Sequence, residues 1–156
     1  MGRLPYQVLV ILYLRDENGL RYCVFERESP ANQIQFVAGG GENDETPLEA
    51  AKREVFEESG IVDAQFQQLV SICYIPTNIF SDAQRKAWGK DVIVVPEHSF
   101  GAETKSDVIK ISNEHKSYRW VSYDEALTLL KWDSNKTALF ELNSKLTFYQ
   151  EVLQHG

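Results

Sequence analysis

The chain has 156 residues, of which 43% are hydrophobic, and this length and composition predict one domain spanning residues 1–156. Its formal net charge of -7 argues against a nucleic-acid surface built on a general basic footprint, although a local basic pocket for phosphates stays open. No apolar run approaches the roughly 18 residues of a membrane span, and residues 1–6 lack the features of a signal peptide, so we expect a cytoplasmic protein without membrane contacts.

The first part of the chain predicts a hairpin. An almost wholly apolar run over residues 7–14 is typical of a central strand that is covered on both faces. An Asn-Gly dipeptide at residues 18–19 supplies the positive φ angles of a hairpin turn, so we expect the partner strand over residues 21–26. Cys23 and Cys73 lie in strand-like runs without paired spacing, and we expect both to be reduced, buried thiols.

A short strand over residues 34–37 is expected next, followed by three consecutive glycines and a helix. Thr46 at the N-cap, Pro47 at the first helical position and Glu49 three residues after the cap form a capping box. Gly60 supplies the left-handed residue with which many helices end. The helix therefore begins at about Pro47 and ends just before Gly60.

This helix contains an unusually large number of glutamates. The residues expected on its buried face are Leu48, Ala51 and Val55. Glu54, Glu57 and Glu58 share a neighbouring arc, where like charges cost roughly 0.2–0.5 kcal/mol per pair. A hard cation such as Mg²⁺ or Mn²⁺ would compensate this cluster, whereas the plain alternative is a solvated acidic helix face.

The rest of the chain alternates strands with helices. Further strands are expected over residues 64–74, 91–96, 108–111 and 114–120, with a loop over 75–80 and an irregular connection over 97–106. Ser122 opens a second capping box, which predicts a short helix through Leu130. A long amphipathic helix follows over residues 134–153 and should pack on the sheet.

Residues 81–90 are predicted as a polar loop with cations beside an aromatic ring. Arg85 and Lys86 could hold a polyphosphate while Trp88 stacks on a flat base. The alternative is a solvated loop with one anchoring tryptophan. Trp132 offers a second surface on which a ring could stack.

The stretch from Gly39 to Ile61 resembles a known family. Gly39, Glu45 and the run from Arg53 to Ile61 match the complete signature of the Nudix hydrolases. The resemblance implies the Nudix fold, an α/β class in which a mixed sheet is sandwiched between helices (α/β/α). The order of expected strands and helices agrees with this architecture.

The resemblance also implies a metal site. In that family the counterparts of Glu57 and Glu58 are metal ligands, and that of Glu54 is a ligand or the catalytic base. The backbone carbonyl before the first signature glycine, here Ala38, can coordinate metal as well. The implied cofactor is Mg²⁺ or Mn²⁺.

Further roles follow from the same resemblance. Arg53 is expected to orient a carboxylate during catalysis, and Glu45 to pair with Arg53. Arg27, at the end of its strand, is a candidate contact for substrate phosphates, with a surface arginine as the alternative. Gly39 and Gly40 let a substrate approach the main chain.

The tail resembles bacterial dihydroneopterin triphosphate pyrophosphatases. The matching residues are Glu114, His115, Tyr118, Trp120 and the pair Ser134-Asn135. Glu114 is therefore the candidate for an additional catalytic and metal-binding carboxylate, and no role is assigned to His115. Pro76 stands where the ADP-ribose pyrophosphatases carry a proline.

The combined expectation is a metal-dependent pyrophosphohydrolase acting on a small-molecule phosphoanhydride. Its substrate would be linked to a nucleoside diphosphate or be a pterin or nucleoside triphosphate, and pyrophosphate would leave from a triphosphate. The alternatives are an ADP-ribose or nucleotide-sugar pyrophosphatase and a regulatory domain that binds a nucleotide without cleaving it. No nucleic acid or membrane partner is expected, and a homodimer stays open.

Overall fold

The computed structural model describes residues 2–30 and 32–155, with side chains described up to residue 147. The strands are β1 (Arg3–Asp16), β2 (Gly19–Arg27), β3 (Ile34–Gln35), β4 (Val37–Glu42), β5 (Gln65–Pro76), β6 (Val94–Glu103) and β7 (His115–Val121). The helices are α1 (Pro47–Ser59), α2 (Asp82–Trp88), α3 (Tyr123–Leu129) and α4 (Asp133–His155), and Thr77–Ile79 form a 3₁₀ turn, η1. None of the described helices has the length and apolar character that crossing a membrane requires.

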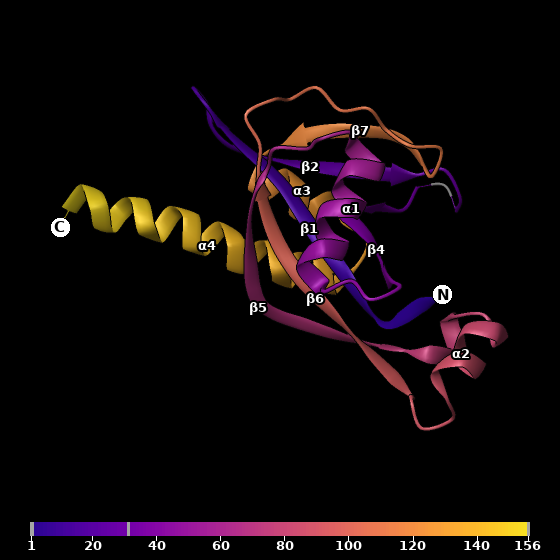
Figure 1. Cartoon of the computed structure of the whole chain (residues 1–156). Coiled ribbons are helices and arrows are strands. Elements are labelled where there is room, and N and C mark those ends of the chain that lie inside the picture. The colour runs from indigo at the N-terminus through magenta and orange to yellow at the C-terminus, as the bar shows by residue number, and fades with distance from the viewer. Residues whose placement is uncertain (1, 31, 156) are drawn as a thin grey trace.

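Strand β1 lies at the centre of a mixed seven-stranded sheet (Figure 1). Along one edge it pairs antiparallel with β2 and β4, and along the other it pairs in parallel with β6. Strand β5 continues the sheet beyond β6, while β3 and β7 pair with β2. The apolar run that predicted a central covered strand is thus confirmed, and the strand extends beyond it at both ends.

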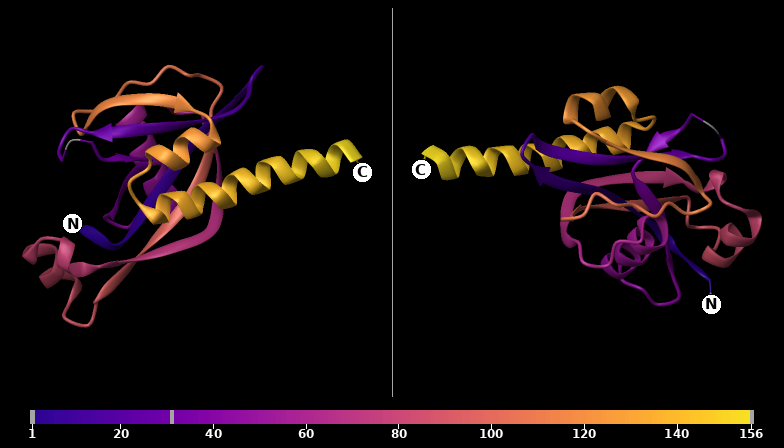
Figure 2. Two further views of the ribbon diagram at one scale, coloured as in Figure 1. Left: turned by 180° about the vertical axis from the view of Figure 1, so that it is seen from behind. Right: turned by 90° about the horizontal axis from the view of Figure 1, so that it is seen from above.

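Helices cover both faces of the sheet. Alternate side chains of β1 point to opposite faces, and because both sets are apolar, each face needs a helix to cover it. One face packs Val8, Val10 and Leu12 against Ala50, Ala51 and Val55 of α1. The other packs Leu9, Ile11 and Tyr13 against Ala126 of α3 and Ala138, Leu139 and Leu142 of α4. Figure 2 shows α1 on one side of the sheet and α3 with α4 on the other, the α/β/α arrangement that was predicted.

Helix α1 begins and ends where its caps predict. The Thr46 side chain accepts a hydrogen bond from the Glu49 backbone N–H at 3.2 Å, and the Glu49 carboxylate accepts one from the Thr46 N–H at 2.9 Å. Gly60 ends the helix with a φ of 78°. The predicted buried face is wrong at Leu48, which is 40% exposed.

The buried face of α1 includes two of its own glutamates. Its buried residues are Ala50, Ala51, Glu54, Val55, Glu58 and Ser59. Glu58 lies near the middle of this arc and Glu57 lies beyond its edge, whereas Leu48 falls within the arc but belongs to the exposed first turn of the helix. Hydrophobic periodicity alone misplaced the arc because two of the side chains that fill it are acids.

Three predicted segments differ in the structure. Residues 82–88 form helix α2 rather than a loop, with the Ser81 hydroxyl accepting from the Gln84 N–H at 3.2 Å. The segment predicted as irregular over 97–106 is mostly strand β6, and the strand predicted over 108–111 is absent. Pro96 is compatible with β6 because pairing with β1 starts only at the following residue, which leaves the proline one free edge.

Candidate active site

A cavity of about 890 Å³ opens over the sheet beside the start of α4. It is bounded by the N-terminal half of β1, by β4, β5 and β6, and by side chains from α1 and the start of β7. Its volume falls within the range of roughly 300–1,000 Å³ that small-molecule sites occupy. Six residues selected from the sequence line it: Arg27, Ala38, Gly39, Gly40, Glu54 and Glu114.

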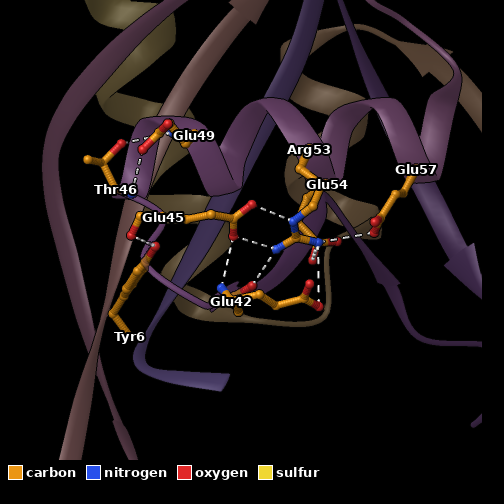
Figure 3. Close-up of polar contacts among 9 residues, drawn as sticks. Tyr6, Glu42, Glu45, Thr46, Glu49, Arg53, Glu54 and Glu57 are labelled. Atoms are coloured by element: carbon orange, nitrogen blue, oxygen red, sulfur yellow. Dashed lines mark hydrogen bonds and ion pairs between the residues drawn. The ribbon is translucent and has the colours of Figure 1, made fainter. Parts of the chain in front are cut away.

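Arg53 organises the acidic side of the cavity (Figure 3). Its Nε and Nη2 atoms donate to the two carboxylate oxygens of Glu45 at 2.7 and 3.0 Å, and Nη2 also donates to the Gly40 carbonyl at 2.7 Å. Its Nη1 donates to Glu54 at 3.0 Å and to Glu57 at 3.2 Å. The hydrogen bonds to Glu45 raise the pKa of Arg53, so the guanidinium stays charged while it holds both carboxylates.

Glu54 and Glu58 are buried carboxyl groups with few donors. Glu58 is 2% exposed and Glu54 is 9% exposed. Burial, followed by the neighbouring Glu54 carboxyl, raises the pKa of Glu58 well above its usual range. Burial also raises the pKa of Glu54, against the opposing effects of Glu58 and Arg53. The Oε2 atom of Glu58 has no hydrogen-bond partner, which is costly for a buried oxygen.

The glycines of β4 let this strand lie directly against charged side chains. A Cβ atom at Gly39 would stand 2.2 Å from the Glu54 carboxylate, and one at Gly40 would stand 2.1 Å from Nε of Arg3. Any larger residue would push these side chains away. The backbone of Ala38 also lies close enough to lower the pKa of Glu58.

The carboxylates of α1 lie near one another, but they do not converge on one point as the ligands of a bound metal ion do. Within the described residues, no three His, Cys, Asp or Glu side chains converge closely enough to hold a metal ion. Arg53 draws Glu54 and Glu57 toward itself instead, and Glu57 is half-exposed. The partnerless oxygen of Glu58 and the raised pKa values of Glu54 and Glu58 nevertheless fit a hard cation, which would supply the positive charge that this pocket lacks.

Glu114, just before β7, and His115, its first residue, approach the acidic pair. Glu114 lines the cavity, and its charge contributes to the raised pKa of Glu58. His115 is 5% exposed, and its Nε2 lies 3.3 Å from Oε1 of Glu58. Burial and the charge of Arg27 lower the pKa of His115 to about 4, so at neutral pH the ring lies beside Glu58 without adding a positive charge. The contact between His115 and Glu58 was not predicted from the sequence, where the only signal was the position of His115 next to Glu114.

The cations and the tryptophan of α2, which were predicted to bind substrate, do not line the cavity, although Gln84 of the same helix does. Arg85 pairs with Asp82 on the exposed side of α2, and neither Arg85, Lys86 nor Trp88 is among the described lining residues. The Trp88 indole N–H donates to the Arg3 carbonyl at 2.7 Å, and the ring packs edge-on against Phe80. Trp88 is therefore an anchor.

The cavity wall also contains residues that the sequence did not single out for this site. These are Gln7, Cys73 and Glu97, together with Trp132, which was named only as a second stacking surface. Cys23 is buried as expected, but Cys73 is half-buried at the cavity, and both thiols are free.

A family model of the NUDIX domain matches residues 5–142, which is most of the chain. The chain belongs to the NUDIX family. Its similarity to the dihydroneopterin triphosphate diphosphatase of Haemophilus influenzae is 30% identity over 134 residues, covering 85% of this chain and 83% of the relative. The asymmetrical bis(5'-nucleosyl)-tetraphosphatase of Sus scrofa is 33% identical over 128 residues, covering 81% of this chain and 80% of the relative.

The fold agrees with solved NUDIX structures. The crystal structure of a NUDIX family protein from Listeria monocytogenes superposes with a TM-score of 0.82 and is 42% identical, covering 94% of this chain and 97% of the other. Together with the named diphosphatase relatives, this shows that the protein is a NUDIX hydrolase.

Proposed function

We propose that this NUDIX hydrolase is a Mg²⁺- or Mn²⁺-dependent pyrophosphohydrolase that cleaves a pterin or nucleoside triphosphate to the monophosphate and pyrophosphate. The observation that carries the proposal is the buried, undercompensated pair Glu54 and Glu58 beside a cavity large enough for a ring and its phosphates. The relative in Haemophilus influenzae, named for action on dihydroneopterin triphosphate, supports this substrate class.

The residues that would hold the cation are Glu54, Glu58 and the carbonyl of Ala38. Glu57 and Glu114 would join them if their side chains turned toward the cation. Such a cation neutralises phosphate charge and lowers the pKa of a bound water. Because Glu57 contacts Arg53 only at its exposed edge, it can leave that contact at low cost.

The remaining roles belong to the chain's own side chains. Arg53, fixed by Glu45, orients Glu54, which lines the cavity. Arg27 lines the same cavity, where its guanidinium can bind a phosphate. Glu54 faces the cavity and can act as a ligand or accept the proton of the attacking water.

A second candidate function is the unequal cleavage of dinucleoside polyphosphates. The similarity to the tetraphosphatase of Sus scrofa favours it, since that relative covers most of this chain at 33% identity. ADP-ribose is the third substrate class to test, because Pro76, its sequence marker, lines the cavity.

A substrate panel with Mg²⁺ decides among these functions. The panel contains dihydroneopterin triphosphate, nucleoside triphosphates, dinucleoside tetraphosphates and ADP-ribose, with pyrophosphate and orthophosphate assayed separately. We expect pyrophosphate as the initial product from a triphosphate, and no turnover when EDTA removes the metal. Orthophosphate as the sole initial product, or much faster cleavage of a dinucleoside tetraphosphate or ADP-ribose, would contradict the proposal.

A further inference from the structure

The end of the cavity near β6 contains a carboxylate that belongs to no metal site. Gly40, Gln7, Glu97 and Cys73 form one transverse row across β4, β1, β6 and β5. Gln7 lies two residues before Leu9, which packs toward α4, so this row faces the same side of the sheet. Four strands thus bring together side chains that are far apart in the sequence.

Glu97 is 6% exposed and its neighbours satisfy it only in part. The Gln7 Nε2 donates to Glu97 Oε2 at 3.0 Å. Among the described residues no cation pairs with this carboxylate, although buried acids are normally paired. Burial raises the pKa of Glu97, and the hydrogen bonds of Gln7 and Ser134 offset this effect only partly.

Gln7 is held so that it presents only its N–H₂ group to Glu97. Its Oε1 accepts a hydrogen bond from Nη2 of Arg3 at 2.5 Å, which determines the orientation of the amide. The Gln7 side chain therefore cannot turn its oxygen toward the cavity floor without breaking two hydrogen bonds. Glu97 remains a fixed acceptor at that floor.

Glu97 is separate from the acidic cluster of α1. The carboxylates whose charges raise the pKa of Glu58 are Glu54 and Glu114. The charge of Glu97 acts instead on the Cys73 thiol of the neighbouring strand, where it contributes to a raised pKa. Glu54, Glu114 and Glu97 line the same cavity. One ligand can therefore reach the carboxylates of the proposed metal site with its phosphates and Glu97 with its other end.

The chemistry of a fixed carboxylate selects the edge of the ring that it can bind. Two acceptor oxygens match two adjacent N–H donors, which is the pattern of a ring N–H beside an exocyclic amino group. Guanine presents this pattern at its 2-amino-6-oxo edge, and pterin presents it at its 2-amino-4-oxo edge. Adenine presents a ring acceptor beside its amino group, and uracil places a carbonyl on each side of its ring N–H, so both would set an acceptor against the carboxylate.

We propose that Glu97 is the specificity-determining residue of this hydrolase and binds the ring N–H and the 2-amino group of a guanine or pterin ring. The inference rests on the proposed function, because the ring must be carried by the phosphate chain that is cleaved. Trp132, which lines the cavity and is 45% exposed, supplies an aromatic face near the ring. Adenine nucleotides are then poorer substrates than their guanine counterparts.

The first test uses the wild-type protein and two substrates that differ only in the 2-amino group, GTP and ITP. A ligand that loses a hydrogen bond to a charged group should suffer roughly tenfold to hundredfold in kcat/KM. Dihydroneopterin triphosphate, assayed in parallel, distinguishes a pterin from a guanine preference. Equal kcat/KM for GTP and ITP would overturn the proposal while leaving the hydrolase function intact.

The second test is Glu97→Gln, which replaces one acceptor by a donor and so matches adenine better than guanine. We expect the GTP-to-ATP ratio of kcat/KM to fall roughly tenfold or more, mainly through weaker use of GTP. Glu103→Gln is the matched control, since Glu103 is the half-exposed last residue of the same strand and pairs with Arg15, so its substitution should leave the ratio unchanged. An unchanged ratio in a folded Glu97→Gln protein would contradict the proposal.

A binding measurement separates this inference from the proposed function. Calorimetry with GMP and IMP in the absence of metal tests the ring site even if no triphosphate is cleaved. We expect GMP to bind roughly tenfold or more tightly than IMP to the wild type, and the difference to disappear in Glu97→Gln. Equal binding of GMP and IMP by the wild type would overturn the role of Glu97 whatever the panel of substrates shows.

Discussion

Helix α1 buries the glutamate Glu58 and helix α4 half-buries Glu141, and the two surroundings differ in their supply of donors. On α4, Glu141 accepts hydrogen bonds from the backbone N–H groups of Val70 and Ser71 at 2.8 Å each and from the Ser71 hydroxyl at 2.6 Å. The Lys145 ammonium adds a fourth donor at 2.6 Å. Although burial opposes ionisation, these donors lower the pKa of Glu141 to about 2.

On α1 the balance is reversed. Glu58 is more deeply buried, one of its oxygens has no partner, and its charged neighbours Glu54 and Glu114 are acids. Its pKa is raised where that of Glu141 is lowered. Glu141 therefore stabilises the docking of α4 on β5, whereas Glu58 gives up local stability at a place suited to a cation.

The largest expected effect comes from removing the undercompensated carboxylate. Glu58→Gln should lower kcat by roughly a thousandfold or more, because a group that would hold the metal is lost. Its Tm should stay the same or rise, since the amide carries no charge that must be desolvated. Kinetics at saturating Mg²⁺ and thermal unfolding check both parts, and near wild-type turnover would remove Glu58 from the site.

The link between the acidic helix and the glycine strand can be weakened without changing charge. Arg53→Lys keeps a cation but loses the fork that binds Glu45 twice and Gly40 once. We expect kcat to fall roughly a hundredfold while KM changes much less, because Glu54 is no longer oriented. Steady-state kinetics measure the split, and a loss confined to KM would instead indicate that Arg53 binds substrate.

The contrasting change on α4 should act on stability alone. Glu141→Gln should reduce the free energy of unfolding by about 2 kcal/mol at neutral pH, because hydrogen bonds to a charged acceptor are lost. Because the folded pKa is depressed, the wild-type advantage is full above about pH 4.5 and disappears as the pH falls toward 2. Urea unfolding across this range tests the prediction, and kcat should stay at the wild-type value.

The two helices also differ in how far sequence alone predicted them. The limits of α1 depend on Thr46, Glu49 and Gly60, which lie within a few residues of the backbone groups they satisfy, so local rules were enough. The partners of Glu141 lie 70 and 71 residues away on β5, and no local pattern reveals them. Packing of the sheet decides that second kind of contact.

The same limit explains the errors at the cavity. Arg85, Lys86 and Trp88 formed a convincing local group, but helix α2 directs Trp88 onto Arg3, 85 residues away. Glu97 was not singled out from the sequence, because its row with Gln7 exists only once β1 and β6 pair in parallel. The signature residues were predicted from the family motif, which specifies their positions directly and does not depend on long-range packing.

The smallest expected effect on activity tests whether Glu114 belongs to the acidic site. Glu114→Gln should lower kcat by roughly tenfold, because Glu114, the residue before β7, acts on Glu58 through its charge and less strongly than Glu54 does. The same substitution should also lower the pKa of Glu58, since a like charge is removed, and so allow Glu58 to ionise at lower pH. Glu103→Gln, an exposed acid paired with Arg15, is the control and should behave as wild type. If Glu114→Gln and Glu103→Gln both retain full activity across the pH range, the working carboxylates are those of α1 alone.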